Sequence, residues 1–315
     1  MRLLSANSLQ LHQFNDEGRL PPYAILSHTW GDQEVSLSDL ESDNISLKSG
    51  FRKIEQACKQ ALIDGLEFVW VDTCCIDKGS SAELSEAINS MFRWYECASA
   101  CYAYLEDVHW QPGLKGSRWF ARGWTLQELI APNEVYFYNS EWKTIGTRTE
   151  LCSCIEEITS INQDVLTAHH RNLGHGTIGP LLASKSVAQR MAWAANRETT
   201  RPEDMAYSLL GLFDIHMPLI YGEGVNKAFT RLQAEILRDS ADHSILAWST
   251  ESHISTITVD QPQSTPGGPI DPRDHVAVAL ATQPKLFALC KNIATILASD
   301  ARPIEMTSRG LKIDL

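Results

Sequence analysis

Short apolar runs of strand length alternate with helix-periodic segments in the first half of the chain, and this pattern limits the fold most strongly. Four runs predict strands: YAILS (23–27), EFVWVD (67–72), ACYAYL (100–105) and VYFYN (135–139). Three segments between them predict helices: 50–64, 82–97 and 124–130. Strands that alternate with helices imply right-handed crossovers and a mostly parallel sheet. We therefore expect a flavodoxin-like α/β domain over residues 1–147, with helices on both faces of the sheet.

The second half of the chain has a different hydrophobic pattern, in which helical segments follow one another without strands. The predicted helices cover 148–159, 186–196, 202–213 and 225–239, and a loop rich in His and Gly is expected over 160–180. We interpret 148–250 as a helical companion region. Residues 251–315 begin with a linker rich in Pro, Gly and Ser and end in the strand-like RGLKIDL, and we leave them unassigned.

The acid excess limits the partners of the chain. Its 315 residues carry 39 acidic and 27 basic side chains, for a formal charge of −12. Nucleic-acid backbones and anionic membranes attract a basic surface, so the composition argues against both. No run approaches the roughly 18 uninterrupted apolar residues of a membrane span. The first residues also lack the apolar stretch of a secretory signal, so we expect a cytoplasmic protein.

Polar and aromatic side chains gather where the predicted strands end. Ser27 ends the first predicted strand, and His28 and Trp30 follow it. Asp72 ends the second strand, and Arg122, Trp124 and Glu128 come after the third. Ligands of open parallel sheets bind outside the carboxyl ends of the strands. We therefore expect these residues to line one cleft.

Glu128 has two interpretations. At about 100° per residue, Leu126, Leu129 and Ile130 share one side of the helix, whereas Trp124 and Glu128 project to the other. The first interpretation is a solvated carboxylate on a polar helix face. The second is a carboxylate aimed into the strand-end cleft, with the tryptophan as a stacking wall. Periodicity alone favours the first.

The eight cysteines are scattered through the chain, which predicts reduced thiols rather than disulfides. No two pairs of them stand at zinc-ligand spacing, so we predict no metal site. A rival constellation makes Cys74 a nucleophile, with His28 and Asp72 expected at the same edge of the sheet. Two adjacent cysteines after a buried strand are more often core residues, and the cysteine hydrolase is the lesser alternative.

Two further patterns favour structural roles. Arginines and acids are dense between residues 190 and 204, which favours a salt-bridge network between helices over a phosphate site. The Gly-Glu-Gly run at 222–224 does not follow a strand with the glycine spacing of a dinucleotide-binding turn. We interpret these glycines as turn residues.

Long runs of the chain resemble a known family. YAILSHTWGD (23–32), FVWVDTCCIDK (68–78), MFRWYECASACYAYLEDV (91–108) and RWFARGWTLQELIAP (118–132) resemble the heterokaryon incompatibility (HET) domain of filamentous fungi. Residues 191–237 resemble the region that commonly follows it. The resemblance implies a role in fungal non-self recognition, in which HET domains trigger programmed cell death of fused incompatible cells. It also implies a possible sensor protein as partner.

HET domains are in turn similar to the Toll/interleukin-1 receptor (TIR) domain, which has a flavodoxin-like fold. A helix of TIR domains carries a tryptophan-cysteine-x-x-glutamate-leucine motif, and WTLQEL (124–129) is similar, with Thr125 in place of the cysteine. In catalytic TIR domains that glutamate supports cleavage of NAD at the nicotinamide–ribose bond. The resemblance thus implies that Glu128 is catalytic and that NAD, or a related nucleotide, is the substrate, with no cofactor.

The remaining strand-end residues complete the predicted binding site. Trp30 or Trp124 would stack on a ring, and His28 and Arg122 would meet the diphosphate. Ser27 and Asp72 complete the substrate-binding set. A second hypothesis of a different class is a non-catalytic signalling module that acts by homotypic association, since TIR-like domains also assemble. In either case we expect a homo-oligomer on activation.

Overall fold

The computed structural model describes residues 1–42, 44–169, 176–249, 280–294, 305–307 and 310–312. Seven strands form one sheet in the order β2-β1-β4-β3-β5-β6-β7. Their bounds are Arg2–Ser5 (β1), Leu11–Gln13 (β2), Tyr23–His28 (β3), Phe68–Val71 (β4), Ala100–Tyr104 (β5), Val135–Tyr138 (β6) and Thr144–Thr147 (β7).

The four predicted strands are confirmed, and they lie parallel to one another in the centre of the sheet, in the order β4-β3-β5-β6. Strands β1, β2 and β7 were not predicted. They extend the sheet on both sides and pair antiparallel with their neighbours. Each has only three or four residues, which is too short for alternation to stand out from the surrounding sequence.

Helices cover both faces of the sheet, as predicted. Helix α1 (Phe51–Ile63) joins β3 to β4, the helical turn α2 (Asp72–Cys75) and α3 (Ser81–Cys97) join β4 to β5, and α4 (Thr125–Ile130) precedes β6. The first crossover runs in the opposite direction to the next two, so right-handed connections place α1 on one face and α3 with α4 on the other. The reversal lies between β3 and β5, where a doubly wound sheet opens a crevice for ligands.

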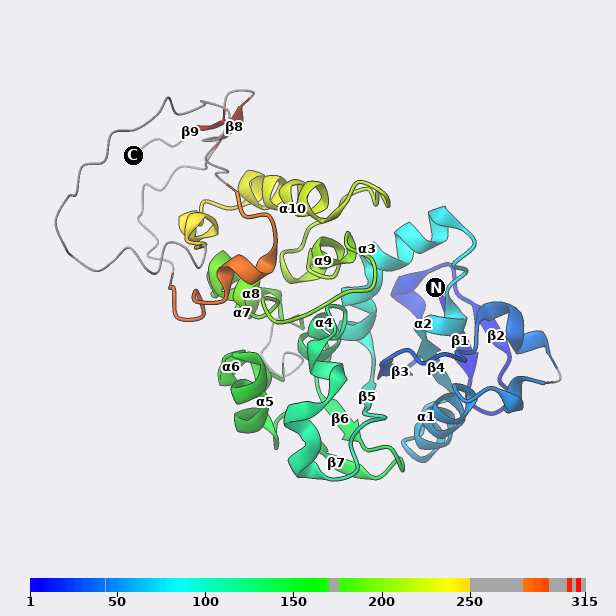
Figure 1. Ribbon diagram of the computed structural model, residues 1–315. Coiled ribbons are helices and arrows are strands. Elements are labelled where there is room, and N and C mark those ends of the chain that lie inside the picture. The colour runs from blue at the N-terminus through cyan, green and yellow to red at the C-terminus, as the bar shows by residue number, and fades with distance from the viewer. Residues whose placement is uncertain (43, 170–175, 250–279, 295–304, 308–309, 313–315) are drawn as a thin grey trace, which may run out of the picture.

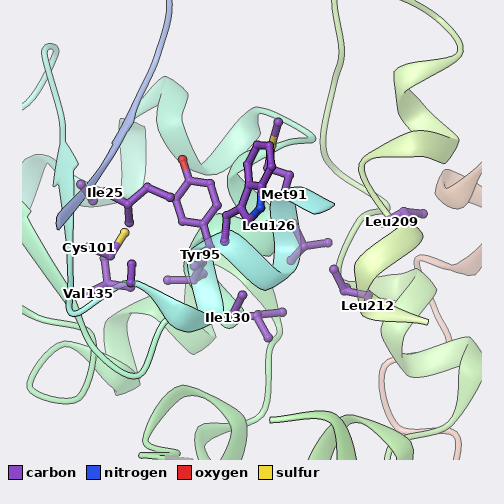
Figure 2. Packing of buried hydrophobic residues seen from close by; sticks show 14 of the residues in the cluster. Ile25, Met91, Tyr95, Cys101, Leu126, Ile130, Val135, Leu209 and Leu212 are labelled. Carbon is purple, nitrogen blue, oxygen red and sulfur yellow. The ribbon is translucent and has the colours of Figure 1, made fainter. Parts of the chain in front are cut away.

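The core beneath α3 and α4 holds α4 against the sheet. Figure 2 shows Tyr95 of α3 and Leu126 and Ile130 of α4 packed beside Ile25 of β3 and Cys101 of β5. All of these side chains are buried. Successive side chains of β5 point to opposite faces of the sheet, as expected when both faces are covered. Cys101 approaches the α4 backbone, whereas Tyr102 points to the face that α1 covers.

The helical region consists of six helices in the described residues. They are α5 (Cys152–Thr159), α6 (Gln163–Leu166), α7 (Gly179–Ala183), α8 (Val187–Ala192), α9 (Asp204–Tyr207) and α10 (Val225–Asp239). The loop prediction for 160–180 was therefore wrong at both ends, since one-turn helices such as α6 are too short to show a period. Figure 1 shows α7–α10 grouped beside α3 and α4, away from α1.

The C-terminal part is described only in pieces. Residues 280–294 pack against the helical region, and the Gln233 side chain of α10 exchanges two hydrogen bonds with the backbone of Ala281. Strands β8 (Glu305–Thr307) and β9 (Gly310–Lys312) form a separate antiparallel pair, which confirms a strand at the RGLKIDL end. The predicted linker lies outside the described residues. Within the described segments, no helix is long and apolar enough to cross a membrane.

Candidate functional site

Helix α4 places Glu128 at the carboxyl edge of the central strands. Every residue of this helix is buried, so the interpretation of Glu128 as a solvated carboxylate was wrong. The side of the helix opposite the apolar stripe faces β3 and the helical region rather than water. The buried Arg148 guanidinium fixes the far end of the helix by donating to five backbone carbonyls: Leu129, Ile130, Pro132, Asn133 and Ala168. A cation at a helix C-terminus also stabilises the helix dipole.

The Glu128 carboxylate is held by the end of β3. Its Oε2 accepts a hydrogen bond of 2.5 Å from the Ser27 hydroxyl, and Ser27 Oγ in turn accepts one of 2.8 Å from the Trp119 indole. Burial raises the pKa of Glu128 to about 7, and the hydrogen bond from Ser27 opposes the rise. A carboxyl group with this pKa is partly ionised at neutral pH, which is the range in which a catalytic group changes charge.

A cleft of about 600 Å³ opens beside Glu128. Six of the seven predicted site residues line it: His28, Trp30, Asp72, Arg122, Trp124 and Glu128. The seventh, Ser27, is fully buried behind the carboxylate. The structure thus brings together side chains from three strand ends, as the topology predicts. Cavities of 300–1,000 Å³ typically hold small-molecule ligands and cofactors.

One end of the cleft contains a buried histidine between two carboxylates. His28 Nε2 lies 3.7 Å from Asp72 Oδ1 and 3.8 Å from Glu34 Oε2. Burial lowers the pKa of His28 well below its usual value, and the nearby Lys53 lowers it further, so the imidazole is neutral at pH 7. Burial also raises the pKa of Asp72. A neutral ring among hydrogen-bond acceptors suits a ligand that presents hydroxyl groups.

Cations surround the exposed tryptophan of the same end. Trp30 donates from its indole nitrogen to Asp72 Oδ2 at 2.8 Å, and 44 % of its surface remains exposed. Lys78 Nζ lies 3.7 Å from the centre of the Trp30 ring, and Arg122 Cζ lies 5.7 Å from it. Lys78 was not among the predicted residues. These cations locally oppose the acidic charge of the whole chain and fit an anionic group of a ligand.

A second wall of the cleft comes from the helical region and was not predicted. It consists of Glu198, Thr199, Thr200, Arg201, Asp204 and Tyr221, and Arg118 also lines the cleft from the segment before α4. The two walls are joined by backbone pairing, since Gly123 N donates to Glu198 O and Glu198 N donates to Ala121 O. The available signal in the sequence was the density of charged residues before Asp204, which we interpreted as structural.

Within the described residues no ion pair joins the arginines and acids of that stretch, so the predicted salt-bridge network was wrong. Arg197 is buried and donates to the Arg122 carbonyl at 2.9 Å and to Thr125 Oγ1 at 3.0 Å. Burial lowers its pKa to about 9, and the negative charge of Glu128 opposes the shift. Arg197 therefore fixes the first turn of α4 and places a positive charge near the carboxylate.

We predict that substituting Gly123 separates the two walls. A Cβ at this position would lie 2.5 Å from Thr199 Cγ2, closer than side chains pack. Gly123→Ala should lower the free energy of unfolding by about 1–3 kcal/mol, the usual cost of overpacking. Urea denaturation measures the change. Adding Thr199→Ser removes the clashing methyl group and should recover more than half of the loss; a double variant no more stable than the single one would contradict this contact.

Cys74 does not have the surroundings of a nucleophile, and the described residues show no metal-binding cluster. Cys74 is completely buried, and its pKa is raised well above the usual value through its neighbour Cys75 and burial. A nucleophilic cysteine needs an accessible thiolate, so the site favours neither activation nor access. Among the residues that the structure describes, no group of three His, Cys, Asp or Glu side chains is arranged to hold a metal ion.

Comparisons with known proteins agree with the resemblance in the motifs. The family model of the heterokaryon incompatibility protein (HET) matches residues 23–116, from β3 to the segment before α4. A model of a domain of unknown function (DUF8212) matches residues 227–309. The chain is 49 % identical over 235 residues to vegetative incompatibility protein HET-E-1 of Podospora anserina, a match that covers 70 % of this chain and 16 % of that protein. No solved structure matches the chain significantly.

Proposed function

Because this chain carries a domain of the heterokaryon incompatibility family, we propose that it acts in fungal non-self recognition through an NAD glycohydrolase site in which Glu128 is the catalytic carboxylate. The observation that carries the proposal is the position of Glu128, buried at the edge of a cleft lined by aromatic and cationic side chains. The order of the four parallel strands, β4-β3-β5-β6, is that of flavodoxin-like sheets and supports the TIR-like comparison.

The proposed reaction breaks the bond between nicotinamide and ribose. The bonding electron pair moves to the positively charged pyridinium nitrogen, so nicotinamide leaves as a neutral molecule without a general acid. Water then adds to the ribose carbon, which gives ADP-ribose and a proton. The transition state resembles an oxocarbenium ion, and an ionised carboxylate beside it lowers its energy. Glu128 can perform this role only when it is deprotonated.

The neighbouring residues have corresponding roles in the proposal. Ser27 donates to Glu128 Oε2 and so favours its charged form. Arg122 and Lys78 would meet the diphosphate. His28, predicted to meet it as well, has a pKa lowered by burial and is neutral, so together with Asp72 it would instead face ribose hydroxyls. Trp124 would contact a ring.

The alternative of a non-catalytic association module predicts a different strand-end surface. In that case Glu128 would be paired with a cation on a flat face. The carboxylate instead accepts a hydrogen bond from Ser27 and borders a cleft. This geometry favours the enzyme, and incubation of the full chain with NAD decides between the two. Nicotinamide release supports the enzyme, and intact NAD supports the module.

We expect the rate of nicotinamide release to depend on pH. Because the pKa of Glu128 is about 7 and the ionised form is active, kcat/KM should rise about tenfold per pH unit below 7 and level off above it. Ser27→Ala removes a hydrogen bond to the charged form and should move this acid limb to higher pH. The exposed Ser38→Ala is the matched control and should leave the profile unchanged. A profile that is level from pH 5 to 8 would contradict the assignment.

A further inference from the structure

One buried carboxylate joins the two walls of the cleft. Asp204 Oδ2 accepts a hydrogen bond from the Trp124 indole at 3.1 Å, and its Oδ1 accepts one from the Tyr221 hydroxyl at 3.0 Å. Trp124 is the N-cap residue of α4, whereas Tyr221 lies just before α10, almost a hundred residues further along the chain. Both rings line the cleft. Since one carboxylate holds both polar edges, the spacing of the two rings depends on Asp204.

A second buried carboxylate fixes the turn that carries Tyr221. Glu203 is buried, and its Oε1 accepts hydrogen bonds from the backbone of Gly222 at 3.0 Å and of Gly224 at 2.9 Å. These glycines have φ values of +99° and +82°, a region that other residues rarely adopt. The Gly-Glu-Gly run therefore does more than reverse the chain, because it keeps the preceding tyrosine in place.

Two neighbouring side chains also fix the ring of Tyr221. Tyr207 packs against it edge to face, with 5.6 Å between ring centres. Arg201 Cζ lies 4.3 Å from the centre of the Tyr221 ring, so a guanidinium rests on its face. Arg201 itself lines the cleft. A planar cation stacked on an aromatic ring presents a flat surface that also attracts negative charge.

We propose that Trp124, Tyr221 and Arg201 form a slot for the planar heteroaromatic ring of a nucleotide, and that Asp204 is the positioning residue that sets its width. The ligand class rests on the proposed function. Every nucleobase has a flat aromatic face, so bases stack on aromatic and guanidinium planes largely irrespective of which base is present. Arg118 and Arg122, in the same cleft, would meet the adjoining phosphates. Adenine and nicotinamide share this chemistry, and the experiment separates them.

Titration calorimetry of the full chain with adenosine monophosphate and, separately, with nicotinamide mononucleotide tests the slot. Tyr221→Leu removes one stacking plane and should weaken the ligand that occupies the slot by at least about tenfold. Tyr221→Phe keeps the ring and loses only the bond to Asp204, so a smaller loss of about threefold is expected. Tyr136→Leu, on β6 and outside the cleft, is the matched control and should bind both ligands unchanged.

Asp204→Leu tests positioning separately. The leucine is of similar size but has no polar atom, so it can hold neither the Trp124 indole nor the Tyr221 hydroxyl. The affinity for the ligand in the slot should fall by about three- to tenfold while that for the other mononucleotide stays constant. A general loss of stability would weaken both mononucleotides alike and leave the ratio of their two affinities unchanged. Circular dichroism of each variant confirms that it is folded.

The outcomes assign or reject the slot. Weakening of adenosine monophosphate alone identifies an adenine slot, and weakening of nicotinamide mononucleotide alone identifies a nicotinamide slot. If the Tyr221 and Asp204 variants bind both ligands as the unaltered chain does, or if the unaltered chain binds neither, the proposal is wrong. Binding that depends on Tyr221 in a chain that releases no nicotinamide would instead overturn the proposed reaction and keep the slot.

Discussion

Glu128→Gln should lower the rate of nicotinamide release by roughly 10²–10³-fold, the range seen when one electrostatic contact to a transition state, such as an oxyanion-hole donor, is removed. The glutamine has nearly the same shape and can still accept the hydrogen bond from Ser27 Oγ. It carries no negative charge to oppose the developing oxocarbenium ion. Chromatography of nicotinamide formed from NAD measures the loss. Glu141→Gln changes an exposed carboxylate near β7 and is the control, which should keep full activity.

The same substitution should raise stability at alkaline pH. In the folded chain the pKa of Glu128 is about 7, above its usual value of 4.5, so the folded state binds this proton more tightly than the unfolded state. Stability therefore falls as the pH rises from 4.5 through 7, by about 3 kcal/mol in all. Glutamine does not ionise and avoids this loss.

Urea unfolding at two pH values tests this prediction. At pH 8, Glu128→Gln should be more stable than the unaltered chain by up to about 3 kcal/mol, whereas at pH 4.5 the two should differ little. A gain in stability together with a loss of activity is typical of a group kept for function. Equal stability at both pH values would show that Glu128 is ionised without cost, and our description of its environment would be wrong.

Arg148→Lys should destabilise the fold by about 3–5 kcal/mol, the range seen when a buried charged group loses its partners. Arg148 is completely buried and reaches five carbonyl oxygens with both ends of its guanidinium. The lysine ammonium is a single point with three donors, so at least two of these carbonyls would lose their partner. Each buried, unsatisfied group costs about 1–3 kcal/mol.

The measurement is the free energy of urea unfolding, with Arg238→Lys as the control. Arg238 is exposed and pairs with Glu235 within α10, so its substitution should change stability by less than about 0.5 kcal/mol. Because Arg148 holds the end of α4, any folded Arg148→Lys protein should also release nicotinamide more slowly. A loss no larger than that of the control would show that α4 does not depend on this cap.

The parallel core of the fold could be predicted from sequence because its strands are buried on both faces. The β3 strand is buried along its whole length, and such strands appear as continuous apolar runs. Strand β1 depends on pairing with β4, far along the chain, which local patterns do not show. Strands β2 and β7 are the short hairpin partners of β1 and β6, and each has too few residues for a pattern to stand out. The one-turn helix α6 is similarly set by packing, since Val165 and Leu166 are buried.

The sheet half of the site could also be predicted, because topology alone brings strand ends together. The other half could not. The helical region brings Arg201, Asp204 and Tyr221 to the cleft because it packs against α3 and α4. The spacing of these residues in the sequence does not show which helices pack together. The burial of Glu128 was missed for the same reason. Its polar side is covered by residues from the end of β3 and from the helical region.

The central claim is that this chain cleaves NAD at the nicotinamide–ribose bond. The most direct measurement is product analysis after incubation of the full chain with NAD at pH 8. The protein concentration is varied over a range in which the chain is present both as monomers and as oligomers. We predict that nicotinamide and ADP-ribose appear in equal amounts. NAD that remains intact at every concentration and in every oligomeric state would contradict the account and leave a binding module as the explanation of the cleft.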